Sequence, residues 1–420
     1  MQEFFPFFII LLVAVIFSQA FMRMRVPWVV SLIVGGIIVG PNGLDWFRSD
    51  ATIEFLATIG LVLLMFMAGV ESKLGDIKGL KKKVAIIGGL GGFVPTIAGV
   101  TVALAFGYEW PTALLLGIIF MSSAVALLVP SFQEHKIIDA DLGRTIIASA
   151  IIIDAISLLL LSIFLQFTTV QPGDFTALLV YPFAFVVLGA FAWLLPKLRW
   201  VALSGMDQDD SDMFERELRF TMLMVISLVV FFEFVGLHAI IAGFFAGMIL
   251  SRHLSNTLLK AKLHALSYGF FVPVFFVSMG ASTDMSVFFD GPRALFVMAV
   301  VVIVLTGTKF ISGYLGGRLA GFDVTASKYV GASIIPQLST ALAVAFLGFG
   351  EGLLDQELLS AIVGLAIITS IVSPFYVNKI GRQIVARKPE PTPVDDIPPT
   401  IIAGGKIAPT TVTDRKNDEA

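Results

Sequence analysis

Residues 146–167 read IIASAIIIDAISLLLLSIFLQF, and Asp154 is the only charged residue in this stretch. A run of about 20 apolar residues is long enough to cross a bilayer as a helix. A carboxylate at the centre of such a helix costs about 2.5–3.5 kcal/mol of insertion free energy, so it is typical of a functional site. The stretch therefore predicts a membrane-spanning helix that carries a functional acid.

The composition as a whole indicates an all-α polytopic membrane protein. The chain has 420 residues, of which 57% are hydrophobic and only 14% are charged, whereas a soluble protein carries about 25% charged residues. The net charge of −3 does not indicate a nucleic-acid partner. The chain contains no cysteine, and it shows no catalytic nucleophile, metal-ligand cluster or phosphate-binding loop. We therefore expect no cofactor and no enzymatic activity.

Apolar runs predict about thirteen transmembrane helices within a membrane domain of residues 1–386. The first run has no basic segment before it and no small-residue cleavage site after it, so we expect a retained helix and not a signal peptide. The polar, proline-rich segment 387–420 is expected to be a disordered tail. The expected spans are roughly 4–21, 27–43, 52–70, 84–106, 111–132, 145–168, 176–196, 217–236, 239–251, 263–281, 294–317, 327–349 and 357–378.

The distribution of lysine and arginine predicts the orientation of these spans. If the N-terminus lies outside, 22 of the 28 basic residues fall in inner loops, and only Arg48 and Arg293 fall in outer loops. Cytoplasmic loops of membrane proteins are enriched in lysine and arginine. We therefore expect the C-terminus to be cytoplasmic.

A second charge lies deep in another apolar stretch. Lys309 is the only charged residue between positions 294 and 317. Charged groups within membrane spans face the interior of the bundle and pair with one another along ion or proton pathways. We therefore expect Lys309 to be the charge partner of Asp154. The alternative is an ion pair that only holds two helices together.

A short pattern recurs at two distant positions. Residues 65–72 read MFMAGVES and residues 276–283 read FVSMGAST, and each is an apolar run followed by glycine and polar residues. These copies end the third and the tenth expected spans, and an odd offset of seven spans gives them opposite orientations. The pattern predicts an inverted-topology repeat. Repeat one covers about 4–168, a linker helix covers about 176–196, and repeat two covers about 217–380.

The same offset pairs the spans 111–132 and 327–349, and both carry polar residues near their midpoints. Pro336 removes a main-chain donor and predicts a break in the second span, while Ser122 and Ser123 give a weaker indication in the first. Half-helices that end at the membrane midplane present free main-chain groups and dipoles to an ion. Alternatively, the serines allow close helix packing, and the polar residues near Pro336 satisfy the broken backbone.

These observations predict one composite site. The residues expected to bind the ion or the proton are Asp154, Ser122, Ser123 and Ser157, and the residues expected at the broken helix are Ser333, Pro336, Gln337 and Ser339. Carboxylate, hydroxyl and carbonyl oxygens suit hard cations. The metal at Asp154 would therefore be a transiently bound monovalent cation.

Several phrases of the chain carry a family resemblance. They are GLVLLMFMAGVE at 60–71, SSAV at 122–125, IID at 152–154, EFVGL at 233–237, AGFFAG at 242–247, PVFFV at 273–277 and Lys309. In this order and spacing the chain resembles the monovalent cation:proton antiporters over about residues 5–385. Among them it is most similar to NapA-like sodium/proton exchangers and to the membrane domains of glutathione-gated potassium efflux (Kef-type) proteins.

The resemblance implies a homodimer in the bacterial inner (plasma) membrane that works by an elevator-like movement. It also implies two crossed broken helices, the sodium/proton antiporter-like fold, and competition between proton and cation for Asp154. Lys309 would neutralise Asp154 when no cation is bound. Two positions depart from the family pattern. Ile153 stands where relatives often have Asp, Asn or Gln, and Gln337-Leu338-Ser339 follows Pro336 where many have Arg-Gly-Glu.

With one carboxylate at the site, the sequence favours one-for-one, electroneutral exchange of Na⁺ or K⁺ for protons. Two alternatives remain open. One is a cation channel or uniporter, although the polar residues gather at one depth and do not line a continuous pore. The other is a membrane sensor that keeps the fold without transporting, which Ile153 makes conceivable.

Overall fold

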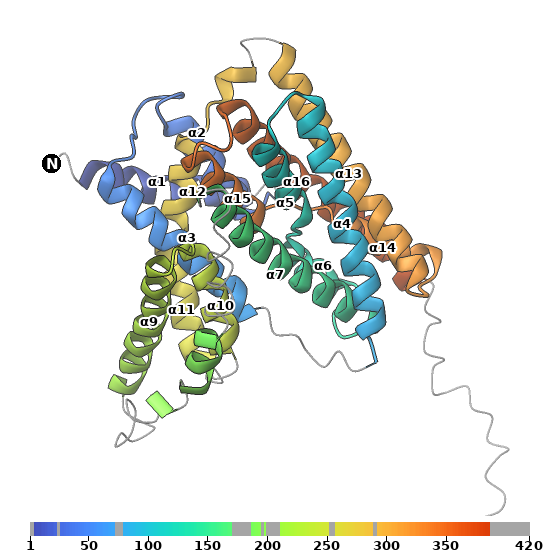
Figure 1. Ribbon diagram of the computed structural model, residues 1–420, viewed down its shortest axis with the longest axis horizontal. Coiled ribbons are helices and arrows are strands. Elements are labelled where there is room, and N and C mark those ends of the chain that lie inside the picture. The colour runs from blue at the N-terminus through green and yellow to red at the C-terminus, as the bar shows by residue number, and fades with distance from the viewer. Residues whose placement is uncertain are drawn as a thin grey trace, which may run out of the picture.

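The structure, a computed structural model, describes residues 4–22, 26–71, 79–169, 186–194, 197–198, 211–251, 257–288 and 292–386. Every regular element within these ranges is a helix (Figure 1). The α-helices are α1 (Phe4–Met22), α2 (Trp28–Val39), α3 (Ala51–Glu71), α4 (Lys81–Ala105), α5 (Trp110–Met121), α6 (Val129–Glu134), α7 (Asp141–Thr169), α9 (Ser211–Phe234), α10 (Ala239–Ser251), α11 (Thr257–Leu266), α12 (Val272–Ala281), α13 (Pro292–Leu319), α14 (Val324–Ser333), α15 (Ser339–Gly350) and α16 (Gln356–Ala386). The tighter or wider turns are η1 (Val125–Leu128, 3₁₀), η2 (Ser267–Phe271, π) and η3 (Met285–Phe288, 3₁₀).

The chain is a multi-pass membrane protein. Within the described ranges, eight helical stretches are long and apolar enough to cross a bilayer, and α2, α10 and α15 are shorter apolar helices. The expected linker span 176–196 lies mostly outside the described residues, although 186–194 are helical. The predicted tail 387–420 lies outside them entirely. The count of thirteen spans therefore stays a prediction.

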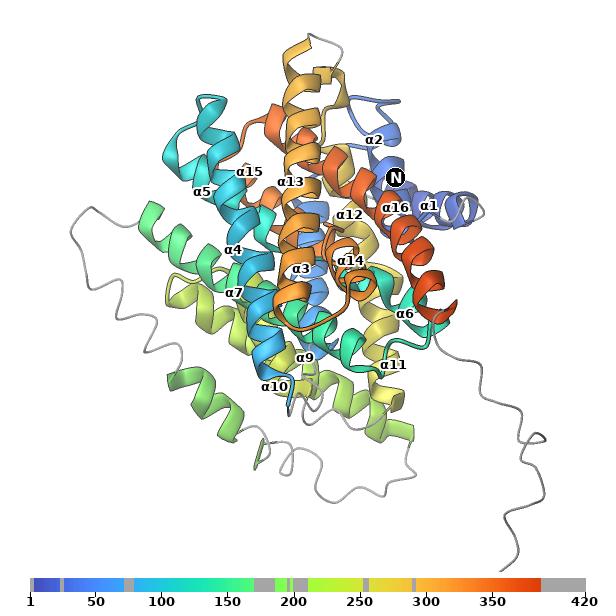
Figure 2. The same ribbon diagram turned by 90° about the vertical axis from the view of Figure 1, so that its right-hand side faces the viewer.

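The helices gather into two bundles that diverge towards the bottom of Figure 1. The first bundle contains α1–α3 and α9–α12, in which α3 packs on α10 and α2 packs on α12. The second bundle contains α4–α7 and α13–α16, and α13 lies at its centre against α4, α14 and α16 (Figure 2). Asp154 and Lys309 both belong to the second bundle, on α7 and α13.

Glycines set two close helix contacts in the first bundle. A Cβ atom on Gly69 of α3 would collide with the carbonyl oxygen of Phe244 on α10. A Cβ atom on Gly280 of α12 would collide with the carbonyl oxygen of Ile33 on α2. These are the glycines of the recurring pattern, and they bring α3 against α10 and α12 against α2. Small residues allow membrane helices to approach closely, because no large side chain then separates the two backbones.

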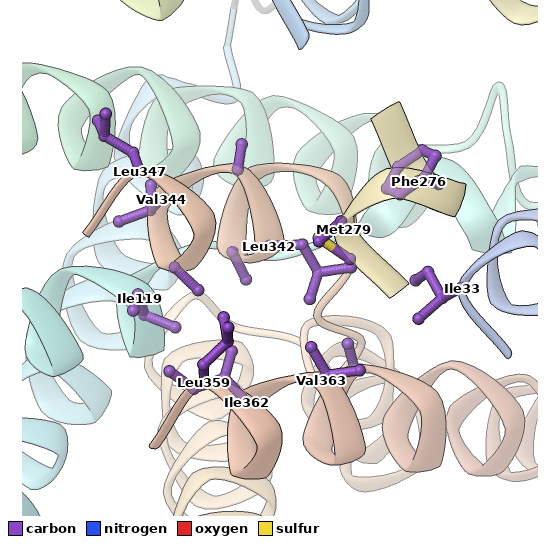
Figure 3. Close-up of a cluster of buried hydrophobic side chains, with 14 of the residues drawn as sticks. Ile33, Ile119, Phe276, Met279, Leu342, Val344, Leu347, Leu359, Ile362 and Val363 are labelled. Carbon is purple, nitrogen blue, oxygen red and sulfur yellow. The ribbon is translucent and has the colours of Figure 1, made fainter. Parts of the chain in front are cut away.

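A buried apolar cluster joins the two bundles. Ile33, Phe276 and Met279 of the first bundle belong to the same buried cluster as Leu342 and Val363 of the second (Figure 3). The rings of Phe275 on α12 and Phe346 on α15 also meet edge to face, with centroids 5.7 Å apart. This cluster closes the interface between the bundles on the side of α15 and the start of α16.

Candidate functional site

A cavity of about 790 Å³ lies between the two bundles, and Asp154 lines it. Its walls come from α2, α3, α10 and the α11–α12 segment on one side, and from α7 and the region after α5 on the other. Ser123, Leu338, Ser339 and Thr340 line it together with Asp154. The carboxylate of α7 therefore faces a space large enough for a hydrated ion, beside the places where two helices are interrupted.

The first interruption follows α5. The helix ends at Met121, Ser122 adopts an extended conformation (φ −62°, ψ 166°), and regular structure resumes as η1 at Val125. Pro130 lies in the first turn of α6, where a missing N–H costs no hydrogen bond. Since no proline stands between Met121 and Val125, the break depends on partners that other helices supply.

The second interruption follows α14. This helix ends at Ser333 and α15 begins at Ser339, so Pro336 and Gln337 lie in the non-helical stretch between them. Helix α16 satisfies the exposed backbone here. The N–H of Gln337 donates to Oγ1 of Thr369 (3.2 Å), and Oγ of Ser370 donates to the carbonyl oxygen of Gln337 (3.4 Å). Sequence inspection missed Thr369 and Ser370, because hydroxyls in an apolar helix carry no signal of which backbone they serve.

Hydrogen bonds join the two interruptions to each other. The N–H of Ala124 donates to the carbonyl oxygen of Pro336 (2.7 Å), and Oγ of Ser123 donates to the carbonyl oxygen of Ile334 (3.0 Å). Ser122 and Gln337 bond reciprocally. Oγ of Ser122 donates to Oε1 of Gln337 (2.8 Å), while Nε2 of Gln337 donates to the carbonyl oxygen of Ser122 (2.6 Å). Main-chain groups of these stretches that lack helical partners are thus paired with groups of the other stretch.

Lys309 is fully buried in α13 and makes three hydrogen bonds. Its Nζ donates to the carbonyl oxygens of Met121 (2.6 Å) and Gly91 (3.2 Å) and to Oγ of Ser123 (2.8 Å). Met121 is the last residue of α5, where the helix dipole places partial negative charge. The ammonium therefore caps the end of α5 with one hydrogen bond and bonds α4 and Ser123 with the other two.

Ser123 connects the lysine to the acid. Its main-chain N–H donates to Oδ1 of Asp154 (3.1 Å), and its hydroxyl accepts from Lys309. The ion pairs between described residues are Arg48–Asp45, Arg144–Asp141 and Arg293–Glu357, and none joins Asp154 to Lys309. The two intramembrane charges are bridged by Ser123 and form no direct ion pair, and the predicted charge partnership of Asp154 and Lys309 stays a prediction.

The remaining predicted residues lie in different places. Oγ of Ser157 donates to the main-chain oxygen of Asp154 (2.9 Å), and Oγ of Ser333 donates to that of Tyr329 (2.7 Å), so both hydroxyls serve their own helices. Neither serine lines the cavity, whereas Ser339 does. Ile153 is buried against α4, beside Gly91 and Gly92, and likewise does not line the cavity.

A cation at this site would bind to few ligands of fixed charge. Among the described residues, no three His, Cys, Asp or Glu side chains converge on a common point. Asp154 offers a carboxylate, and Ser123, Ser339 and Thr340 bring hydroxyl and carbonyl oxygens to the same cavity. Such a set suits a hard monovalent cation that is bound and released, and it does not suit a resident transition metal.

Comparison with known proteins identifies the family. The family model described as "Sodium/hydrogen exchanger, transmembrane" matches residues 8–381. The chain belongs to this family of monovalent cation:proton antiporters. The relatives are transporters and not enzymes, as the sequence predicts.

Two relatives and one solved structure illustrate the match. "Probable Na(+)/H(+) antiporter 3" of Methanocaldococcus jannaschii is 29% identical over 90% of this chain and 96% of its own length. "Na(+)/H(+)-K(+) antiporter GerN" of Bacillus cereus is 28% identical over 89% of this chain and 95% of its own length. The structure of the sodium proton antiporter MjNhaP1 of M. jannaschii superposes with a TM-score of 0.65 at 16% identity, over 90% of this chain and 97% of that one. This last likeness supports the antiporter fold.

Proposed function

We propose that the protein exchanges a monovalent cation for protons across the membrane, with Asp154 binding one or the other in turn. The observation that carries the proposal is the position of Asp154, a carboxylate in an apolar helix that faces a cavity where two interrupted helices meet. The family membership of the chain and the names of its relatives, which are Na⁺/H⁺ antiporters, support the same activity. The cation is Na⁺ or K⁺, since one relative is named for both.

Exchange is proposed to be one-for-one and electroneutral. Asp154 offers one negative charge, which either a proton or a cation neutralises. Nζ of Lys309 donates hydrogen bonds to Met121, Gly91 and Ser123. These three acceptors, and not an ion pair with Asp154, stabilise its positive charge. Losing a proton from Lys309 would leave one of these three buried acceptors without a donor, which is costly. We therefore assign the transported proton to Asp154.

Alternating access is proposed to be an elevator-like movement of the second bundle against the first. The cavity reaches Asp154 from one side, while the apolar cluster around Met279 and Leu342 closes the interface elsewhere. The order long helix, interrupted helix, long helix occurs twice, as α4–α7 and α13–α16. Gly69 and Gly280 occupy the same place in the recurring pattern, and each lies against a carbonyl oxygen of a neighbouring helix. Both relations support an inverted-topology repeat, which is the usual basis of such movements.

Orientation and assembly complete the proposal. The positive-inside distribution supports an N-terminus outside, a cytoplasmic C-terminus and a cavity that opens to the cytoplasm. We propose a homodimer in the inner (plasma) membrane, as the family resemblance implies. The exposed apolar residues of α1, among them Phe4, Phe5 and Phe8, suit contact with lipid or with a second copy.

The decisive experiment compares the wild type with Asp154→Asn in proteoliposomes that carry a pH gradient. Na⁺, K⁺, Li⁺ and Rb⁺ are added in turn, and recovery of a pH-sensitive dye is followed. The proposal expects recovery with one or two cations in the wild type and none in the variant. Recovery in both proteins would contradict a role for Asp154. Cation flux without coupled proton movement would favour the channel, and no flux in a folded wild type would favour the sensor.

A further inference from the structure

A groove of about 530 Å³ lies between α4 and α7, apart from the cavity that contains Asp154. Ile152, Ile153 and Ile156 of α7 line the groove, whereas Ile151 and Asp154 line the cavity. With about 3.6 residues per turn, these two sets lie on opposite faces of α7. The helix that carries the acid therefore separates the ion cavity from a second, apolar space.

The groove follows α4 from the first residue of this helix to the level of the ion site. Lys81, Gly88 and Phe93 are among the residues of α4 that line it. At about 1.5 Å per residue, Lys81 and Phe93 are about 18 Å apart along the helix, which is close to the hydrocarbon depth of one leaflet, about 15 Å. The deep end reaches Met121, whose carbonyl oxygen accepts a hydrogen bond from Lys309. The groove thus extends from the predicted cytoplasmic surface to the region of the two intramembrane charges.

Three glycines of α4 keep the groove open, and close helix packing does not require them. A Cβ atom on Gly89 would meet no atom within 4 Å, and one on Gly88 would meet Ser149 first, at 3.7 Å. The nearest atom to a Cβ on Gly92 would be Cε of Met121, at 3.4 Å. These would be ordinary contacts, and glycine inside a helix is less favourable than alanine. The three glycines therefore indicate space for a ligand and not a contact between helices.

The rim of the groove is apolar and exposed, and its cytoplasmic end is basic. Phe93 is 65% exposed and Ile156 is 43% exposed, which suits contact with lipid chains. Among the described residues that line the groove, Lys81 is the one charged residue, and Lys82 and Lys83 follow it in the chain. The cytoplasmic leaflet contains anionic lipids, which attract basic groups beside a membrane helix. A second copy packed on this face by two-fold symmetry would instead bring its own lysines against these, and like charges repel.

We propose that this groove binds an anionic phospholipid of the cytoplasmic leaflet, with one acyl chain along α4 and the phosphate beside Lys81. Ile153 gives the groove an apolar wall, and a polar side chain there would face the acyl chain without a partner. The end of the chain would pack on Met121, the residue that ends α5 and accepts from Lys309. Bound lipid is therefore expected to stabilise the part of α5 that holds Lys309. The inference does not depend on the proposed antiport.

Native mass spectrometry of the purified protein in a mild detergent measures the binding directly. Phosphatidylglycerol is the anionic probe, and phosphatidylcholine is the zwitterionic one. For the wild type we expect the Kd for phosphatidylglycerol to be about fivefold lower than the Kd for phosphatidylcholine, because of the attraction of one lysine. Lys81→Gln should remove this difference. Equal Kd values of the wild type for the two lipids would overturn the proposal.

Gly89→Leu tests the acyl-chain part of the site. The open space around Gly89 admits a larger side chain, so we expect the variant to fold. Its Kd for both lipids should rise about tenfold, because the new side chain displaces about two methylene groups of the acyl chain. Gly307→Leu is the matched control, since Gly307 lies inside α13, has the same open space and does not line the groove. Wild-type binding by Gly89→Leu, or an equal rise of Kd in both variants, would overturn the proposal.

Lys82→Gln separates the groove from a general attraction of lipid to a basic surface. Lys82 is exposed and adjacent to Lys81, but it does not line the groove. We expect this variant to keep its preference for phosphatidylglycerol. If Lys82→Gln loses the preference as fully as Lys81→Gln does, the lysines attract anionic lipid without a defined site, and the proposal fails.

Thermal unfolding provides a second measurement. Added phosphatidylglycerol should raise the unfolding temperature of the wild type more than that of Gly89→Leu, because a ligand stabilises the state that binds it. An equal rise in both proteins would overturn the proposal. A changed oligomeric mass of Gly89→Leu with unchanged lipid binding would show that a second copy occupies the groove, and would also overturn it. Neither measurement depends on transport, so failure of the lipid site and failure of the proposed exchange are distinguishable.

Discussion

Asp154 and Lys309 share Ser123 as their hydrogen-bond partner. The N–H of Ser123 donates to the carboxylate, and its hydroxyl accepts from the ammonium. The lysine is held by the end of α5, and the acid is free to face the cavity. The cation or proton bound at Asp154 can therefore change without breaking an ion pair with Lys309.

This arrangement predicts weak energetic coupling between the two charges. A direct buried pair loses about 3–5 kcal/mol when one partner is removed, and removing both restores much of that loss. In a double-mutant cycle with Asp154→Asn and Lys309→Met, we expect a coupling free energy of about 1 kcal/mol or less. Unfolding of the purified variants measures it. A coupling free energy of about 3 kcal/mol would show a direct pair that this conformation does not contain.

Lys309→Met alone should destabilise the protein. It leaves the carbonyl oxygens of Met121 and Gly91 buried without donors, and each such group costs about 1–3 kcal/mol. Asp154→Asn should be neutral or stabilising by comparison, because it replaces a charge at bilayer depth with a neutral amide. Thermal unfolding in one detergent compares the two variants. A greater loss of stability in Asp154→Asn would contradict the assignment of Lys309 as the structural cap.

The two broken helices should depend on the reciprocal bond between Ser122 and Gln337. Gln337→Leu removes both side-chain hydrogen bonds and leaves the carbonyl oxygen of Ser122 without that donor. We expect a loss of stability of about 1–3 kcal/mol, with a lower kcat. Gln133→Leu makes the same change at an exposed position and should shift the unfolding temperature little. Equal effects of the two substitutions would argue against the bond.

Much of this site could be predicted from sequence, and the parts that could not have a common cause. Asp154 and Lys309 stand out because charge is rare in apolar spans, and Pro336 marks a helix break by its missing N–H. Two of the three partners of Lys309 are main-chain carbonyl oxygens, which every residue has, so the residue types of Gly91 and Met121 do not indicate them. The break after Met121 is likewise stabilised by the non-helical stretch between α14 and α15, and the local sequence indicates this break only by two serines.

Ser157 shows the limit of helical spacing as a guide. It stands three residues after Asp154, on the same face of the helix, yet its hydroxyl bonds the main-chain oxygen of Asp154. A serine in a membrane helix satisfies its donor in this way whenever no better acceptor is near. We therefore expect Ser157→Ala to keep the cation KM within about twofold of the wild type. Ser123→Ala, which removes the hydroxyl between Lys309 and Ile334, should lower transport and stability. Transport assays of both variants test the contrast.

Competition for one carboxylate predicts a specific pH dependence. If a proton and a cation exclude each other at Asp154, the apparent KM for the cation should fall as pH rises, by about tenfold per unit while Asp154 is mostly protonated. It should level off once the carboxylate is mostly ionised, and the maximal rate at saturating cation should stay nearly constant. Exchange rates over a grid of pH and cation concentration measure this. A maximal rate that changes while KM stays fixed would indicate a second titrating group that controls the movement.

Movement between the bundles can be tested by cross-linking, because the chain contains no cysteine and every introduced thiol is unique. Phe275 on α12 and Phe346 on α15 lie in different bundles, and their rings are in contact. We expect the double variant Phe275→Cys, Phe346→Cys to lose exchange when a short bifunctional thiol reagent joins the two positions, and to recover it after reduction. Each single-cysteine variant, treated in the same way, should remain active. Full exchange by the cross-linked protein would mean that these helices stay together through the cycle, and the elevator-like movement would have to occur elsewhere.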